Sequence, residues 1–237
     1  MTKTNLSLLL LLCLCALSSA LSAQEAYRPT WRLELSYLQS AQRQAKTDNA
    51  KNVYFGGRIG GMVEFDLPRV DILKLRTGLS YSLQYAGNTQ HYALANSEGK
   101  LEYVDYQHYM HNVSVPLHVL LTVRIWKDLH LFAYGGPQFV IGLAHTTKAD
   151  PHLTATTQAT LQATFGHEVG NTTRDLYTTD YFDDGLRRLN VQAGVGGGIQ
   201  WKRVRLFGGY DWGLNDIGRA PYRTRLSGWY AGTSYAF

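Results

Sequence analysis

Leu73–Tyr85 reads LKLRTGLSYSLQY, and Leu189–Trp201 reads LNVQAGVGGGIQW. In both stretches apolar or aromatic residues dominate the odd positions, and small or polar residues fill the even positions between them. Successive side chains of a β-strand point to opposite faces of the sheet, so a period of two predicts a strand. These stretches therefore predict strands with one apolar face and one polar face.

The same alternation recurs elsewhere, and no convincing amphipathic helix lies between the alternating stretches. The further strands are expected at Trp31–Leu38, Tyr54–Asp66, Val113–Val123, Leu129–Leu143, Val204–Gly213 and Arg225–Phe237. Together with the first two, they make an all-β chain of about eight strands.

The predicted connections alternate in length along the chain. They are long at about 39–53, 86–108 and 144–188, short at 67–72, 124–128 and 202–203, and of medium length at 214–224. Barrels that span a membrane have short turns on the periplasmic side and longer extracellular loops. The sequence therefore predicts an eight-stranded antiparallel up-and-down transmembrane β-barrel with both termini on the periplasmic side.

Aromatic residues gather near the predicted strand ends, as expected where amphipathic rings meet the two bilayer interfaces. Trp31, Phe65, Trp126, Trp201 and Phe237 are expected at the periplasmic rim, and Tyr37, Tyr54, Tyr85, Tyr109 and Trp212 at the other rim. The apolar strand faces would then contact outer-membrane lipids.

The polar strand faces are expected to point into the barrel. They are rich in glycine and serine, which leave room in a narrow lumen for long side chains from neighbouring strands. Long charged side chains occur at the matching parity: Arg32, Glu34, Arg58, Glu64, Lys74, Arg76, Arg205 and Asp211. Buried charges need partners, so we expect a lumenal network of salt bridges; a proton or ion path is the less favoured alternative.

The first 23 residues differ from the rest and predict a cleaved secretory signal peptide. Lys3 supplies a positive start, Leu6–Leu17 is almost entirely apolar, and small residues follow up to the expected cleavage after Ala20 or Ala23. A helical membrane anchor is disfavoured, because the apolar core is short and no stop-transfer charges follow it. Residues 24–237 would then form the barrel domain, located in the bacterial outer membrane.

Composition narrows the remaining classes. Both cysteines, Cys13 and Cys15, lie in the signal segment and outside a lipoprotein context, so a mature chain without disulfides or a lipid anchor is expected. The formal net charge is +5. No run of basic residues with interleaved aromatics accompanies it, so no nucleic-acid partner is expected.

The C-terminal residues, Tyr230–Phe237, resemble the β-signal by which barrel-assembly machinery recognises outer-membrane proteins. Gly232, Tyr235 and Phe237 match its pattern, whereas Tyr230 stands where a polar residue is more usual. The resemblance implies that this machinery is a partner during insertion. The alternative is simply a last strand with aromatic ends.

The stretch His111–Leu143 resembles the centre of the PorT-type outer-membrane barrels of Bacteroidetes. Pro116 within a strand and the segment Tyr134–Pro137, Tyr-Gly-Gly-Pro, carry the match. Asn190–Gly198, Phe207–Tyr210 and Gly213–Ile217 resemble the last hairpins of that family. The resemblance implies an OmpA-like eight-stranded barrel whose role is generally unassigned.

No catalytic, metal or cofactor site is predicted. The histidines fall mostly in loops or at strand ends without zinc-site spacing: His91, His108, His145, His152 and His167. The His-x-Ser pair of lipid A deacylases is missing, and the nearest combinations are His111 with Ser114 and His145 with Thr147. The acidic segment Asp180–Gly185 lacks EF-hand spacing, so a solvated loop tip is preferred to a calcium site.

The connection from His145 to Arg188 is the predicted functional surface, because long loops without regular structure are usually functional or disordered. Deleting Thr154–Thr179 from it should leave the barrel intact. We therefore expect a binding or structural module of the cell envelope that presents extracellular loops or docks to a larger assembly. A lipid-modifying enzyme is the alternative, and a narrow pore is the least favoured.

Overall fold

The computed structural model describes residues 29–44, 51–67, 70–95, 101–152, 179–180, 182, 186–218 and 223–237. The predicted signal peptide and its cleavage site lie outside these ranges. The strands are β1 (Thr30–Gln44), β2 (Lys51–Leu67), β3 (Val70–Ala95), β4 (Leu101–Trp126), β5 (Leu129–His152), β6 (Thr179–Asp180), β7 (Leu189–Trp201), β8 (Val204–Gly213) and β9 (Thr224–Ala236). Within the described ranges, no helix is long and apolar enough to cross a membrane.

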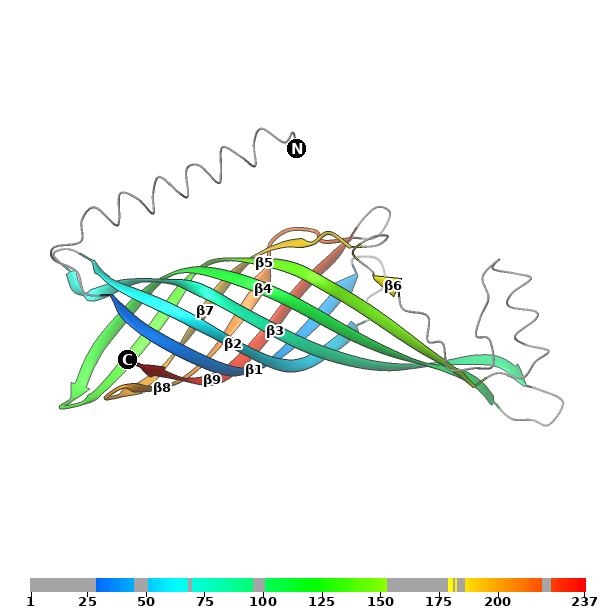
Figure 1. The fold of residues 1–237 in the computed structure, drawn as a ribbon, viewed down its shortest axis with the longest axis horizontal. Coiled ribbons are helices and arrows are strands. Elements are labelled where there is room, and N and C mark those ends of the chain that lie inside the picture. The colour runs from blue at the N-terminus through cyan, green and yellow to red at the C-terminus, as the bar shows by residue number, and fades with distance from the viewer. Residues whose placement is uncertain are drawn as a thin grey trace, which may run out of the picture.

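Eight of these strands form a closed antiparallel ring (Figure 1). Each pairs with its neighbours along the chain, β5 pairs directly with β7, and β1 pairs with β9 to close the ring. The short strand β6 only adds two residue pairs to the edge of β5. The predicted eight-stranded up-and-down barrel is therefore confirmed.

The two ends of the barrel differ. Residues 68–69, 127–128 and 202–203 connect strands at one end, where β1 also begins and β9 ends. We call this the short-turn end and the opposite one the loop end. Lys202 in one of these turns has a φ of 53°, a left-handed conformation common in tight turns.

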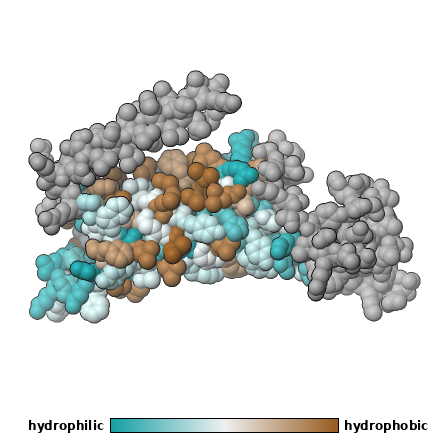
Figure 2. All heavy atoms as spheres, viewed as in Figure 1, coloured by the Kyte–Doolittle hydropathy of each residue, from teal (hydrophilic) through white to brown (hydrophobic). Residues whose placement is uncertain are grey.

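The two faces of the wall have the predicted polarity. Leu79, Leu131 and Ile199 point outward and are exposed, whereas Glu64, Arg76 and Gln84 point inward and are buried. Apolar residues gather over the middle of the visible face of the barrel, with hydrophilic residues towards both ends (Figure 2). The apolar belt therefore faces outward, where a bilayer can cover it.

Three strands are much longer than the sequence predicted. The predicted connection at 86–108 is wrong, because β3 continues to Ala95 and β4 begins at Leu101. β5 likewise continues to His152, into the predicted 144–188 loop, and β1 and β2 extend into the predicted 39–53 loop. The last pair between β2 and β3 is Phe55 with Tyr85, so β3 runs on for roughly 30 Å at the usual rise per residue. In Figure 1 this extension projects to the right of the ring.

A register shift interrupts the pairing of β4 with β5. His111 pairs with Ala144, but Asn112 pairs with Gly142, so Leu143 is an extra residue in β5. Such a β-bulge reverses which side chains point inward. Up to this point the even residues of β5 face the lumen; beyond it His145 and Thr147 are the buried ones.

The predicted aromatic rims are confirmed with one exception. Trp31, Trp126, Trp201 and Phe237 are exposed at the short-turn end, with Phe65 half-buried beside them, and Tyr37, Tyr85 and Trp212 are exposed towards the loop end, with Tyr109 half-buried. Tyr54 was placed wrongly: only 1% of it is exposed, and it points into the lumen. The reason is parity, since Tyr54 shares the inward face of β2 with Arg58 and Glu64.

Candidate functional site

The part of the lumen towards the short-turn end contains the predicted salt-bridge network. Both terminal guanidinium nitrogens of Arg205 donate to the Glu64 carboxylate, and Arg32 Nε lies 3.2 Å from the same group. The side chains of these three residues are at most 3% exposed. Two cations thus share one carboxylate away from bulk water.

The other predicted charges are paired as well. Arg76 donates to Glu34 at 2.5 Å, Arg58 lies 3.8 Å from Asp211, and Lys74 lies 2.7 Å from Asp66. All eight charged side chains expected in the lumen therefore have an ionic partner, which confirms the network.

An aromatic plug lies on the loop side of the Glu64 group. It consists of Leu38, Leu120, Phe132, Tyr134, Phe207 and Tyr230. The Tyr134 hydroxyl donates to Tyr230 at 3.1 Å. Arginine side chains stack on its rings: Arg58 on Tyr230 at 4.3 Å, Arg76 on Tyr134 at 4.8 Å and Arg205 on Phe132 at 4.7 Å.

Glycines make room for the plug. A Cβ atom on Gly196 would collide with the Tyr134 ring, and one on Gly209 would collide with the Tyr230 ring. The small residues of the polar strand faces therefore serve the purpose expected of them, since the ring is narrow and the side chains of neighbouring strands fill it.

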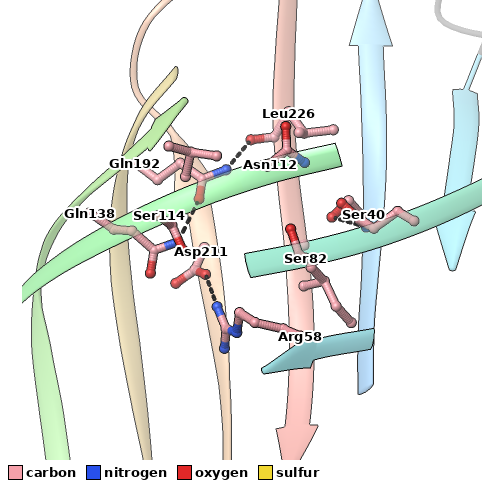
Figure 3. Close-up of a pocket in the computed structure, with 13 residues that line it drawn as sticks. Ser40, Arg58, Ser82, Asn112, Ser114, Gln138, Gln192, Asp211 and Leu226 are labelled. Carbon is pink, nitrogen blue, oxygen red and sulfur yellow. Dashed lines mark hydrogen bonds and ion pairs between the residues drawn. The ribbon is translucent and has the colours of Figure 1, made fainter. Parts of the chain in front are cut away.

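A small polar chamber follows on the loop side of the plug (Figure 3). Its volume is about 30 Å³, which leaves room for only a few water molecules. Gln138 donates to Gln192 at 3.3 Å, and Gln192 donates to the Leu226 carbonyl at 3.3 Å. Figure 3 also shows Arg58 and Asp211 pointing towards one another at its edge.

An apolar cap closes the loop end of the lumen. It consists of Tyr54, Ala86, Met110, Phe182, Leu186, Ile217 and Leu226. Phe182 belongs to the predicted solvated loop tip, but it is only 4% exposed, so for this residue the prediction was wrong. Gly142 lies directly beneath its ring, with no space for a Cβ atom.

Two histidines lie beside this cap. The Tyr54 hydroxyl and His145 Nε2 are hydrogen-bonded at 3.3 Å, and His108 Nδ1 and Thr147 Oγ1 are bonded at 2.7 Å. The two imidazole rings are 6.1 Å apart. Sequence reasoning placed both histidines in loops or at strand ends but missed this cluster, because the bulge at Leu143 that turns His145 inward leaves no signal in the alternation.

A vestibule opens at the short-turn end. Its volume is about 430 Å³, and the Arg32–Glu64–Arg205 group lies at its floor. The other charged or titratable lining residues are Lys74, Arg124, His130 and Lys202. Sequence reasoning did not single out this cavity, since the contributing residues come from distant segments of the chain.

The considered catalytic combinations do not form pairs. His111 faces outward and is hydrogen-bonded to the Tyr81 hydroxyl at 2.6 Å, whereas Ser114 faces the lumen and is bonded to Ser80 at 2.6 Å. His145 and Thr147 both face inward, but each bonds a different residue. In the part of the chain that the structure describes, no group of three metal-ligating side chains comes together.

Most of the predicted binding loop, residues 153–178, lies outside the described residues, as does His167. His91 and His152 lie on β3 and β5. The PorT-like motifs come together in the wall, where Pro116 of β4 is opposite Gln138, the residue that follows Tyr134–Pro137 in β5.

The chain is similar to several solved structures. Neisserial surface protein A (NspA) is 12% identical with a TM-score of 0.43, and the alignment covers 87% of this chain and 97% of that one. Ail, the attachment invasion locus protein of Yersinia pestis, is 13% identical with a TM-score of 0.36 and coverage of 89% and 99%. The translocator domain of the autotransporter NalP from Neisseria meningitidis is 8% identical with a TM-score of 0.37 and coverage of 87% and 88%. No curated protein sequence matches the chain.

Residues 23–219 match the family described as the outer membrane protein beta-barrel domain. This range includes the first seven strands of the ring and the turns between them. It contains every residue of the ion-pair network. Of the ring, it leaves out only the last strand, β9. The chain therefore belongs to the outer membrane protein beta-barrel domain family and is a protein of the outer membrane.

Proposed function

We propose that this protein is a closed, non-conducting module of the outer membrane that binds a protein partner through its loop end. The observation that carries the proposal is the extension of β3, β4 and β5 beyond the ring. Ordering residues outside the bilayer costs conformational entropy and contributes nothing to spanning it. A paired extension of this length suits a surface that is held out for recognition.

The pairing of the extension suggests how a partner is bound. Beyond Tyr85, β3 pairs with β4 on one side, and none of the described strands pairs with its other edge. An open strand edge carries backbone donors and acceptors that an extended segment of another protein can pair with. The edge of β5 differs, because β6 already pairs with Thr146 and Thr147.

The filled lumen supports a role without conduction. An ion moving along the axis would have to pass the aromatic plug and the paired charges below it. Both are packed by side chains from several strands, and the polar chamber between plug and cap has a volume of only about 30 Å³. Reconstitution of the purified protein in planar bilayers should show no stepwise conductance.

We infer no enzymatic activity. The separation of His111 from Ser114 across the wall supports this, because a nucleophile and its base must come within hydrogen-bonding distance. The lipid-modifying alternative has its own test: the lipid A profile of a deletion strain should match that of its parent. A changed profile restored by the wild-type gene would favour the enzyme.

We propose that, within this family, the chain is related to the PorT-type barrels. It is supported by Pro116 and Tyr134–Pro137, which lie on paired strands. It favours docking to a larger envelope assembly over binding a soluble ligand.

The binding proposal is tested with two loop-end variants. The first removes residues 87–107 and joins Ala86 to His108, which takes away the projecting hairpin. The second removes residues 154–178 and retains β6. Both should keep the heat-modifiable gel migration of a folded barrel, which serves as the fold control.

Tagged wild type and both variants are then compared by affinity purification after cross-linking in intact cells. We expect a partner that the wild type recovers and the hairpin deletion loses. Loss only with the 154–178 deletion would assign binding to that connection, as the sequence predicted. Equal recovery with both variants would contradict binding at the loop end.

A further inference from the structure

The vestibule at the short-turn end lies opposite the surface proposed above and is independent of it. We propose that this cavity binds an acidic peptide segment, either a chain end or a tight turn, through its carboxylates. By the usual asymmetry of outer-membrane barrels, the short-turn end faces the periplasm, so the partner would be a periplasmic protein.

The lining of the vestibule carries more positive than negative charge. Its cations are Arg32, Lys74, Arg124, Lys202 and Arg205, and its carboxylate is Glu64. Glu64 is shared by Arg32 and Arg205, and Asp66 pairs with Lys74. Among the described residues, Arg124 and Lys202 have no acidic partner. Arg124 therefore remains available to an anionic ligand, and the charge of Lys202, whose Nζ lies 5.4 Å from the centroid of the Trp201 ring, is not neutralised by a carboxylate either.

Two polar side chains add further hydrogen-bonding capacity. Thr122 Oγ1 and His130 Nδ1 are buried, and neither has a hydrogen-bonding partner. Both residues line the vestibule, on the neighbouring strands β4 and β5. A hydroxyl donates well to a carboxylate oxygen, as does an imidazole N–H, so rotation of either side chain towards the cavity would add a donor beside the cations.

The shape of the cavity selects the kind of ligand. Its volume of about 430 Å³ falls in the range of about 300–1,000 Å³ that is usual for ligand pockets. The aromatic plug and the Glu64 group close its inner end, so a polymer cannot thread through it. A peptide terminus or the tip of a turn can enter from the open side.

The direction of the cations disfavours a lipid headgroup. Arg124 of β4 and Lys202 of the turn between β7 and β8 line the lumenal cavity, whereas Val123, Leu131 and Leu206 are exposed on the outer face of β4, β5 and β8. A lipid beside the barrel meets the apolar face. A ligand that reaches the cations must come along the barrel axis, and a positive field at that mouth attracts acidic segments.

The test measures binding of a short fluorescent peptide rich in glutamate. The full mature protein is refolded in a non-ionic detergent, and fluorescence anisotropy gives the Kd at low salt. The glutamine counterpart of the peptide is the ligand control. We expect binding of the glutamate peptide only, and weaker binding as salt screens the charges.

The variant is Arg124→Gln combined with Lys202→Asn. Asparagine is chosen because it tolerates the left-handed backbone at position 202. We expect the Kd to rise by about five- to tenfold, as estimated for the loss of two solvent-accessible ion pairs. The matched control is Arg43→Gln with Arg225→Gln, which removes two exposed cations at the loop end. This control should leave the Kd unchanged.

Three results would overturn the proposal. The first is equal binding of the glutamine peptide, and the second is an equal effect of both double variants, which would indicate a response to net charge. The third is displacement of the peptide by inorganic phosphate beyond that caused by chloride at matched ionic strength. That result would indicate a phosphate site instead. None of these outcomes bears on the loop-end deletions, so the two proposals can fail separately.

Discussion

The short-turn half and the loop half of the lumen are built from the same strands, yet they close the barrel in different ways. The short-turn half neutralises charge with charge, as in the Arg32–Glu64–Arg205 group. The loop half has one ion pair beside the plug, Arg58 with Asp211, and beyond it uses uncharged amides such as Gln138 and Gln192 and an apolar cap.

The origin of the closing residues also differs. The ion-pair network and the plug come entirely from strands of the ring. The cap includes Phe182, Leu186 and Ile217, which lie in connections. Backbone hydrogen bonds join these connections, from Arg187 to the Ile217 carbonyl at 2.6 Å and from Ile217 to the Thr224 carbonyl at 2.8 Å. The short-turn half is thus closed by the wall alone, and closure of the loop half depends on the segments that cross it.

Removal of the shared carboxylate should have the largest effect. Glu64→Ala leaves Arg32 and Arg205 buried without their counter-charge, so we expect the free energy of unfolding to fall by about 3–5 kcal/mol. Urea unfolding in lipid vesicles, followed by tryptophan fluorescence, measures it.

The control replaces the whole group, with Arg32→Met, Glu64→Leu and Arg205→Met together. Because no charge is then left unpaired, this variant should be much more stable than Glu64→Ala. Similar losses in both variants would show that the short-turn half does not depend on charge pairing.

A charge on the outer wall should have the next largest effect. Leu79 is 59% exposed, and in water its replacement would cost little. In a bilayer, Leu79→Arg should lower the free energy of unfolding by about 2–4 kcal/mol. Ile125→Arg, near the short-turn rim, should cost only about 0–1 kcal/mol. Equal costs at the two positions would contradict a bilayer around the middle of the barrel.

Truncation of the cap should destabilise mainly the loop half. Phe182→Ala removes the ring that packs over Gly142, and we expect a loss of about 1.5–3 kcal/mol, the usual value for burying such a side chain. Hydrogen exchange should accelerate at the loop ends of β5 and β7 and stay unchanged around Glu64. Acceleration on both sides of the plug would show that the two halves are coupled.

The smallest expected effect is a gain. Arg43 and Arg225 are directly opposite one another on β1 and β9 at the loop end, and like charges in this arrangement repel. Arg43→Gln should raise the free energy of unfolding by about 0.2–1 kcal/mol, and added salt should reduce the gain. Arg43→Lys is the matched control and should give no gain. A gain that does not depend on salt would exclude charge repulsion as its cause.

The sequence predicted well those features that the bilayer imposes. The bounds of β7 and β8 match the prediction, because each residue of those strands has to face either lipid or lumen. The same two-sided environment revealed the eight lumenal charges, which are visible as polar residues at one parity.

The prediction failed where that environment ends. Beyond Tyr85, β3 leaves the apolar belt, so nothing requires an apolar face, and the alternation fades although the strand continues. Tyr54 was misplaced for another reason: its aromatic character was given more weight than its parity. The vestibule and the cap could not be predicted from the sequence pattern, because each combines side chains from segments far apart in the chain.

The bulge in β5 acts on the strand as a frameshift acts on a coding sequence. Residues before Leu143 are presented to the lumen in one frame, and His145 and Thr147 are presented in the other. Deleting Leu143 alone would remove the bulge and leave His145 and Thr147 on the inner face, because the alternation would then run from Gly142 through Ala144 to His145. The same sequence paired without the bulge would instead present Ala144 and Thr146 to the lumen, so the bulge alone decides which side chains line the outer mouth.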